Sequence, residues 1–406
     1  MAGYYDTLET RSEDEREMAL ARELPAQIAN AKDNAPAMAA RLMEVCAADI
    51  SSRAALTALP VLRKSELGAA QKANPPFGGF ATGRGISHVF QSPGPIYEPG
   101  GSAPDWFRLG RFLHAAGVGA GDVVQNCFSY HLTPAGMMFE SGARAVGAVS
   151  FPAGTGQSEQ QAQAAAQLGV STYAGTPDYL KTILDKGAEL GLDLSRITRA
   201  VVGGGALFPS LRAEYKDRGI ACLQCYATAD LGNIAYESPA MEGMIVDEGV
   251  IVEIVTPGTG DPVAAGEVGE VVVTTLNPDY PLIRFATGDL SAVLPGISPC
   301  GRSNMRIKGW MGRADQTTKI KGMFVRPEQV AALVARHPEV QKARLTALRE
   351  GEQDKMLVQV EAEGADMAAL QASVQAVLKL RGEVEILPPG SLPKDGIVID
   401  DKRKYD

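Results

Sequence analysis

The feature that most constrains the fold is a regular alternation of helical and strand-like segments between residues 105 and 202. Short apolar runs follow helical runs of ten or more residues. The expected helices are 107–116, 133–145, 158–168 and 177–190, and the expected strands are 122–128, 145–152, 170–174 and 199–202. Crossover helices of this length connect parallel strands, so the pattern predicts β-α-β units around a parallel sheet.

The pattern changes twice after residue 202. Alternating or β-branched runs at 244–255, 268–276 and 289–293 are separated by glycine and proline, which predicts an antiparallel subdomain. Beyond Gly312 a helix, hairpin, helix and strand are expected, which suits a small α+β domain. These elements are 327–336, 342–348 with 355–362, 366–380 and 383–387. Near the N-terminus, 13–24 and 35–48 read as helices, and the glycine- and proline-rich stretch 74–104 reads as loops.

Charge and apolar patterning narrow the function classes and the partners. The 406 residues include 39 Lys and Arg against 48 Asp and Glu, a formal charge of −9, which argues against nucleic-acid binding. No apolar run is long enough to span a membrane, and the polar, acidic start does not resemble a secretory signal. We therefore expect a cytoplasmic protein. Cys222 and Cys225 form a lone Cys-x-x-Cys pair among only four histidines, so two buried thiols are favoured over a metal or redox site.

Two glycine-rich loops follow expected strands. Gly203-Gly204-Gly205-Ala206 leaves strand 199–202, where ligands of open α/β sheets bind, although a tight turn without a ligand is the simpler interpretation. Gly154-x-Gly156 lacks the third glycine and the acidic residue of a dinucleotide fingerprint. A nicotinamide-linked oxidoreductase is therefore a weak alternative.

The most specific stretch is 281–290, which contains Thr287-Gly288-Asp289 after an apolar run. We expect a turn here that presents the Asp289 carboxylate at a sheet edge. Its two oxygens can accept hydrogen bonds from both hydroxyls of a ribose diol. The plain alternative is a turn aspartate that bonds its own backbone.

Several stretches, in register, resemble the adenylate-forming enzymes, and in particular their phenylacetate–coenzyme A ligase-like branch. They are Tyr226-Ala227-Thr228-Ala229-Asp230, 281–290, Gly312-Arg313-Ala314-Asp315 and 319–327, with similarity also at 4–11 and 128–136. The resemblance covers essentially the whole chain. It implies an α/β fold with a large N-terminal AMP-binding domain, residues 1–312, that combines parallel sheets with an antiparallel subdomain. A small mobile α+β C-terminal domain, residues 313–406, follows.

The resemblance implies an ATP-dependent carboxylate–coenzyme A ligase, which forms an acyl-adenylate and then an acyl-CoA thioester. ATP, Mg²⁺ and coenzyme A would be the cofactors, and a small carboxylic acid the substrate. Related enzymes are often dimers, so a homodimer is a candidate assembly. The implied nucleotide-binding residues are Gly203, Gly204, Gly205, Ala206, Tyr226, Ala227, Thr228, Asp289 and Arg313. Gly203 to Ala206 would line the adenine, and Asp289 would bind the ribose.

The same resemblance assigns the remaining roles. Asp230 stands where the family has a glutamate that helps to hold Mg²⁺, and Ala229 lacks the usual hydroxyl. The implied catalytic residues are Asp230, Arg313 and Lys402. The implied acyl pocket comprises Phe128, Tyr130 and His131, the hinge is Asp315, and Lys321 and Gly322 border the coenzyme A path.

Two departures from the family pattern motivate a second hypothesis. The usual phosphate loop is replaced by 91–99, where prolines remove backbone donors and Glu98 would repel phosphate. Ile397 stands where the family has its C-terminal catalytic lysine; Lys394, Lys402 or Lys404 are candidate substitutes. The alternative is therefore a diverged, non-adenylating relative that binds a nucleotide or an acyl-CoA.

Overall fold

The computed structural model describes residues 3–205, 207, 209–256, 258–311, 314, 318–321, 323–325, 327–350, 353–393 and 397–403. The chain divides into two compact units, Met1–Met311 and Gly312–Asp406. The buried apolar side chains of each unit form clusters of their own, so each unit has a separate hydrophobic core.

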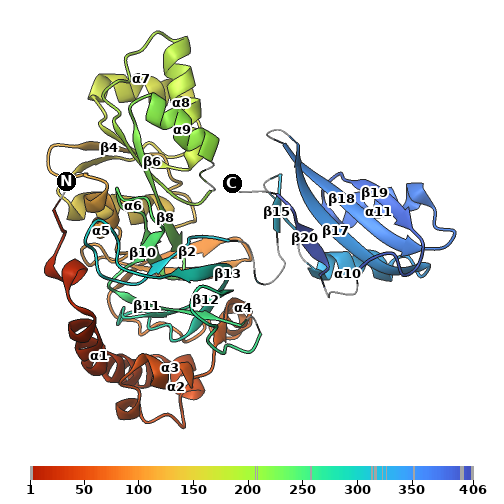
Figure 1. Ribbon diagram of the computed structural model, residues 1–406, viewed down its shortest axis with the longest axis horizontal. Coiled ribbons are helices and arrows are strands. Elements are labelled where there is room, and N and C mark those ends of the chain that lie inside the picture. The colour runs from red at the N-terminus through yellow and green to blue at the C-terminus, as the bar shows by residue number, and fades with distance from the viewer. Residues whose placement is uncertain are drawn as a thin grey trace. The chain divides into compact units, whose positions relative to one another are not determined.

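One part of the large unit contains a parallel sheet, as the alternation of helices and strands predicts. Its strands lie in the order β5-β4-β6-β7-β8. They are β4 (Val123–Asn126), β5 (Val149–Phe151), β6 (Thr172–Gly175), β7 (Arg199–Val202) and β8 (Ala221–Thr228). Helix α5 (Gly110–Ala115) precedes β4, and the helices between the strands are α6 (Ala135–Ala145), α7 (Ser158–Leu168), α8 (Pro177–Glu189) and α9 (Pro209–Asp217). Figure 1 shows α7, α8 and α9 grouped beside the parallel strands.

The sheet continues from β8 into antiparallel strands, which confirms the expected antiparallel part. The order onward is β9-β10-β14-β13-β12-β11. These strands are β9 (Gly232–Tyr236), β10 (Met244–Val246), β11 (Val250–Val255), β12 (Val268–Thr275), β13 (Phe285–Leu294) and β14 (Arg306–Ile307). The run 244–255 is therefore two strands, because a turn at Asp247–Gly249 divides it: the Asp247 side chain accepts the Gly249 N–H.

The N-terminal segment wraps the large unit with helices. They are η1 (Thr7–Thr10), α1 (Glu13–Asn34), α2 (Pro36–Arg41), η2 (Ala47–Asp49), α3 (Arg53–Thr57) and α4 (Lys64–Ala73), with the short strand β1 (Leu62–Arg63) before α4. Helix α1 starts at a capping box formed by Ser12 and Glu15 and runs ten residues past the expected end, through Pro25.

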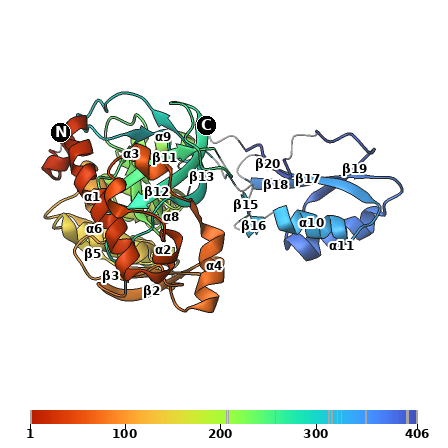
Figure 2. The same cartoon turned by 90° about the horizontal axis from the view of Figure 1, so that it is seen from below.

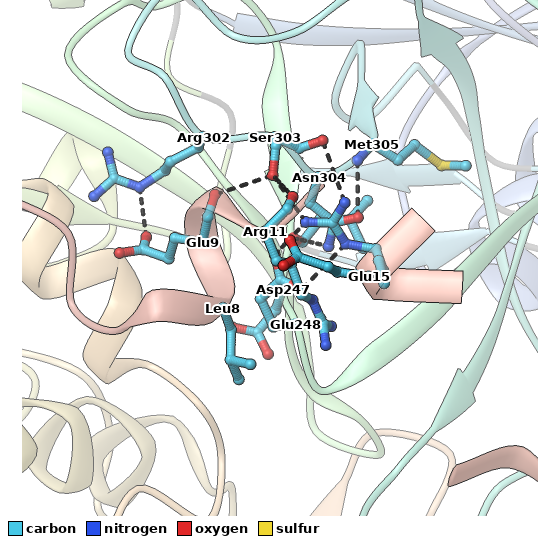
Figure 3. A network of polar contacts seen from close by, with 12 residues as sticks. Leu8, Glu9, Arg11, Glu15, Asp247, Glu248, Arg302, Ser303, Asn304 and Met305 are labelled. Atoms are coloured by element: carbon cyan, nitrogen blue, oxygen red, sulfur yellow. Dashed lines mark hydrogen bonds and ion pairs between the residues drawn. The ribbon is translucent and has the colours of Figure 1, made fainter. Parts of the chain in front are cut away.

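A buried ionic network fixes this segment to the rest of the large unit (Figure 3). The Glu9 carboxylate, 1% exposed, accepts hydrogen bonds from the Tyr236 hydroxyl at 2.9 Å and from Arg302 Nε at 2.5 Å. Arg11 and Arg16 both pair with Glu248, at 2.8 and 3.1 Å. These buried ion pairs connect the N-terminal segment to residues more than 200 positions later in the chain.

The expectation of loops throughout 74–104 is wrong for its second half. Strands β2 (Ile86–Ser92) and β3 (Ile96–Gly101) form an antiparallel hairpin there. Pro99 sits opposite Val89 in this ladder. Proline is tolerated because each strand of a two-stranded sheet keeps one unpaired edge, where the missing N–H costs no ladder bond.

The expected turn at Thr287-Gly288-Asp289 is also wrong, since these residues lie inside β13. The pairing of β12 with β13 shifts there: Glu270 opposes Leu290 and Val272 opposes Ala286, so the three residues bulge opposite Val271 alone. Gly288 adopts a φ of +76°, which a residue with a side chain rarely takes. The bulge redirects the Asp289 side chain without ending the strand.

The small unit is a four-stranded sheet with two helices on one face (Figure 2). The expected elements are present as α10 (Pro327–Ala335), β17 (Val340–Glu350), β18 (Gln353–Ala362), α11 (Met367–Leu378) and β19 (Glu383–Leu387). The sequence did not predict β15 (Thr318–Ile320), β16 (Met323–Val325) or β20 (Ile399–Asp401). Among the described residues of the whole chain, no helix has the length and apolar character needed to cross a bilayer.

Candidate active site

The ends of β7 and β8 place the glycine loop beside Tyr226. Val202, the last residue of β7, pairs with Gln224, so β8 continues past β7. Gly203 then lies against that continuation: a Cβ there would stand 3.1 Å from the Cys225 Sγ atom. Gly204 has a φ of +69°, and a Cβ on it would be 3.7 Å from the Phe128 ring. The loop is therefore held close to β8 on one side and to Phe128 on the other.

A three-residue hydrogen-bonded junction joins β8, β13 and the segment after β14. The Tyr226 hydroxyl donates to Asp289 Oδ2 at 2.8 Å, and Trp310 Nε1 donates to Asp289 Oδ1 at 3.1 Å. Thr287 Oγ1 lies 3.1 Å from the same Tyr226 hydroxyl and accepts the Asp289 N–H. Tyr226 and Asp289 are buried, while Trp310 is 39% exposed. Two stretches that carried the family resemblance thus meet through direct side-chain contact.

Asp230, in the turn after β8, is paired with a lysine from the N-terminal region. Lys64 Nζ donates to Asp230 Oδ2 at 2.6 Å. Lys64 begins α4 directly after β1, and β1 pairs with β13 so that Arg63 opposes Ala286. This pairing places Lys64 next to β13, the strand that contains Thr287 and Asp289. A positive charge therefore lies beside a buried carboxylate close to the junction described above.

The replaced phosphate loop contributes a second buried carboxylate. Glu98, on β3, is fully buried, and its Oε1 atom accepts a hydrogen bond from the Ser92 hydroxyl. Burial, and next the charge of Asp230, raises the pKa of Glu98 to about 7. Among the described residues, no hydrogen-bond partner is present for Glu98 Oε2, Asp230 Oδ1 or the buried Tyr280 hydroxyl.

The residues expected to form the acyl pocket differ in burial. Phe128 is buried and stacks on Phe139, with ring centroids 4.3 Å apart. The half-buried Tyr130 hydroxyl accepts a hydrogen bond from Asn126 at 2.9 Å, and burial raises its pKa. His131 is exposed. Of the three, Phe128 is the residue that the structure places against the glycine loop.

The other expected site residues fall into three groups. Ala227 and Thr228 complete β8 and are partly exposed. Lys321 and Lys402 belong to the small unit, where both are exposed; Lys321 N donates to Asp354 at 3.0 Å, and Lys402 Nζ lies 3.5 Å from Asp400. Ala206, Arg313, Asp315 and Gly322 lie outside the described residues, as do Lys394 and Lys404.

Sequence reasoning missed Lys64 and Trp310 and gave Glu98 only a repulsive role. Lys64 is 166 residues from Asp230, and no local pattern connects them. Trp310 follows Asp289 by 21 residues, and the presence of a tryptophan after the 281–290 stretch was the one available signal.

Both thiols of the Cys-x-x-Cys pair are buried. Cys222 and Cys225 are three residues apart on β8, face different apolar clusters, and have thiol pKa values that burial raises to about 12. Within the residues that the structure describes, no group of three or more His, Cys, Asp or Glu side chains is arranged to hold a metal.

Comparisons with known proteins give a consistent result. The sequence model of the AMP-binding enzyme family matches residues 112–277. A phenylacetate–coenzyme A ligase of Aromatoleum evansii is 29% identical over 378 residues, which cover 88% of this chain and 84% of that protein. The Escherichia coli phenylacetate–coenzyme A ligase is 27% identical over 424 residues, covering 96% and 94%.

The fold is shared with a solved ligase. The crystal structure of a 2-hydroxyisobutyryl-CoA ligase, in complex with 2-HIB-AMP and CoA, superposes with a TM-score of 0.77 at 24% identity and covers 98% of this chain and 92% of that one. The match over nearly the full length agrees with the expected adenylate-forming architecture. Together with the junction of Tyr226 and Asp289, these similarities support a phenylacetate–coenzyme A ligase-like adenylate-forming enzyme.

Proposed function

We propose that this protein is an ATP-dependent carboxylate–coenzyme A ligase that forms an acyl-adenylate and then an acyl-CoA thioester. The observation that carries the proposal is the junction of Tyr226, Asp289 and Trp310 beside the loop that starts at Gly203. Relatives named as ligases match over most of the chain, which disfavours the alternative of a non-adenylating binding protein.

Asp289 is the proposed ribose ligand. A carboxylate has two acceptor oxygens, which suits the vicinal hydroxyls of a ribose. Tyr226 and Trp310 each donate to a different oxygen of Asp289, so they hold its plane in one orientation. Gly203 to Gly205 would then supply a thin backbone wall for the adenine, because glycine has no side chain to keep a ligand away from the backbone.

Adenylation requires that a carboxylate attack an α-phosphate, where negative charge accumulates. Lys64, paired with Asp230, is a candidate cation for this charge. Asp230 Oδ1 has no hydrogen-bond partner among the described residues, so the donor set fits a Mg²⁺ ion, which prefers oxygen ligands. When bound, Mg²⁺ neutralises phosphate charge.

Thioester formation requires the thiol of coenzyme A to reach the adenylate carbonyl. By the family resemblance we assign this path to Lys321 and Gly322, the hinge to Asp315, and phosphate or ribose contact to Arg313. The acid is held beside the apolar wall of Phe128, which stacks on Phe139 next to the glycine loop.

The test is pyrophosphate release with ATP, Mg²⁺ and a panel of acids, followed by acyl-CoA formation. The panel contains phenylacetate and 2-hydroxyisobutyrate, which the relatives' names suggest, together with benzoate and short aliphatic acids. We expect release that depends on at least one acid, and thioester formation with the same acid. ATP binding without release for any acid would favour the non-adenylating alternative.

A further inference from the structure

Glu98 poses an electrostatic problem that the proposed function does not solve. It is fully buried, and the acid Asp230 is 4% exposed. Burying an ionised carboxylate is costly unless it is paired or binds a cation. When Glu98 and Asp230 are both ionised, the single positive charge of Lys64, paired with Asp230, leaves one of the two negative charges of this group unmatched.

The two carboxylates come from segments that the fold locks together. On α4, Gln71 donates to the Tyr97 carbonyl at 2.7 Å and accepts the Tyr97 N–H at 2.9 Å. Those bonds fix the residue before Glu98 to α4, whose first residue, Lys64, holds Asp230. The charges of Asp230 and Lys64 both act on Glu98, and those of Asp230 and Glu98 both act on Tyr280.

The free lone pairs of this group point to a ligand. Ser92 occupies one oxygen of Glu98, and Lys64 occupies one oxygen of Asp230. The other oxygen of each carboxylate, and the Tyr280 hydroxyl, have no hydrogen-bond partner in the described part of the chain. Buried polar atoms almost always have a hydrogen-bond partner. Three oxygens without one, on Glu98, Asp230 and Tyr280, therefore indicate that a ligand binds to them.

We propose that Glu98 and Asp230 together hold a divalent cation, so that the segment in place of the phosphate loop provides a metal ligand instead of backbone donors. Magnesium in proteins is commonly bound by one or two carboxylates, with waters and substrate phosphates completing the shell. The proposal rests on the proposed function only for the source of those phosphates. It removes the apparent conflict between Glu98 and a nucleotide, because a cation between them attracts both.

A Mn²⁺ titration followed by electron paramagnetic resonance tests the proposal without any acid substrate. Free Mn²⁺ is measured for the full chain with and without ATP. We expect Glu98→Gln to weaken Mn²⁺ binding at least tenfold, and Asp230→Asn to do the same. The matched control is Glu237→Gln: Glu237 is also buried but is paired with Arg212, and its variant should bind Mn²⁺ as the wild type does.

Thermal unfolding gives a second readout that does not depend on nucleotide. Mn²⁺ should raise the melting temperature of the wild type, because a ligand of the folded state stabilises it. Glu98→Gln should melt higher than the wild type in the absence of cation, since a buried charge is gone, and should not respond to Mn²⁺. Unfolding of that variant at a lower temperature than the wild type in the absence of cation would contradict the proposed charge imbalance.

The outcomes separate this proposal from the proposed function. If Glu98→Gln and the wild type bind Mn²⁺ equally well, with and without ATP, Glu98 is not a cation ligand. This conclusion holds even if the protein releases pyrophosphate. Glu98-dependent Mn²⁺ binding in a protein that releases none supports the cation site and counts against the ligase assignment.

Discussion

Asp289 is the residue on which the nucleotide assignment depends most directly. We expect Asp289→Ala to weaken nucleotide binding by about 1.5–3 kcal/mol, the scale of a hydrogen bond to a charged group. The Tyr226 and Trp310 donors would also lose their shared acceptor. Calorimetric titration with ATP and AMP measures the loss. Tyr226→Phe is the matched control: it keeps the ring and the carboxylate, so a smaller loss is expected.

An Asp289→Ala variant with wild-type ATP affinity would show that the ribose binds elsewhere. Circular dichroism checks that the variant remains folded, as expected for a substitution on a strand that keeps its ladder.

Asp105 gives the chain a pH-dependent stability that is independent of the proposed reaction. Its side chain accepts the N–H groups of Leu109 and Gly110, yet burial dominates and raises its pKa from 3.8 to about 6. The folded state therefore holds the proton more tightly than the unfolded state. The stability that this proton supplies is complete below pH 3.8 and is lost as the pH rises through about 6. At about 1.4 kcal/mol per pKa unit, the loss is of the order of 3 kcal/mol.

Urea unfolding at a series of pH values between 4 and 7 measures this effect. In Asp105→Asn, which cannot ionise but keeps an acceptor oxygen, the fall in unfolding free energy with pH should be smaller than in the wild type. Parallel curves for the two proteins would contradict the raised pKa.

At the residue scale, sequence predicted the site only where a residue belongs to a local motif. Tyr226 and Asp289 lie in such motifs, and the structure joins them. Lys64 could not be found in this way, because its contact with Asp230 depends on the parallel pairing of β1 with β13. That pairing is fixed by tertiary packing, which a local pattern does not encode.

Among the elements, the N-terminal segment makes the clearest energetic prediction. Glu9→Ala removes the partner of Arg302, whose side chain is 3% exposed, and leaves a buried positive charge. Breaking a buried ion pair from one side costs about 3–5 kcal/mol. Chemical denaturation measures the change in unfolding free energy. Glu13→Ala, at an exposed position in the first turn of α1, should cost less than about 1 kcal/mol. Equal effects of the two variants would show that the network in Figure 3 contributes little.

Element prediction succeeded where periodicity and flanking signals agree. The bounds of α7, β7 and β19 match the expected ones, and α8 follows Thr176 with proline at its first position. It failed at β2 and β3, because glycine and proline indicate loops unless the strands form an isolated two-stranded ribbon. It also failed for the bulge at Gly288, since the sequence of a turn and that of a glycine bulge look alike.

At the scale of the whole molecule, the two units are joined by chain but packed around separate cores. Among the residues that the structure describes, the buried clusters of the large unit contain none beyond Met311, and that of the small unit contains none before Ile320. The change in the pattern of expected helices and strands after Gly312 indicated such a division. The local sequence pattern alone could not give the strand order of the large unit. The pairings of β13 with β1 and β14 depend on contacts between separate segments of the chain.

Separate cores predict that residues 1–311, produced alone, fold and bind AMP. Tyr226, Asp289, Trp310 and Gly203 to Gly205 all lie within this fragment, which lacks Arg313 of the proposed nucleotide ligands, so its AMP affinity should be weaker than that of the full chain but still measurable. Acyl-CoA formation should be lost, because the proposed coenzyme A path uses Lys321 and Gly322. Calorimetric AMP titrations of the full chain and the fragment measure the first expectation, and an assay of acyl-CoA formation by both measures the second. The same fragment carrying Asp289→Ala controls for binding elsewhere. A fragment that folds but does not bind AMP would mean that residues beyond 311 provide an essential part of the nucleotide site.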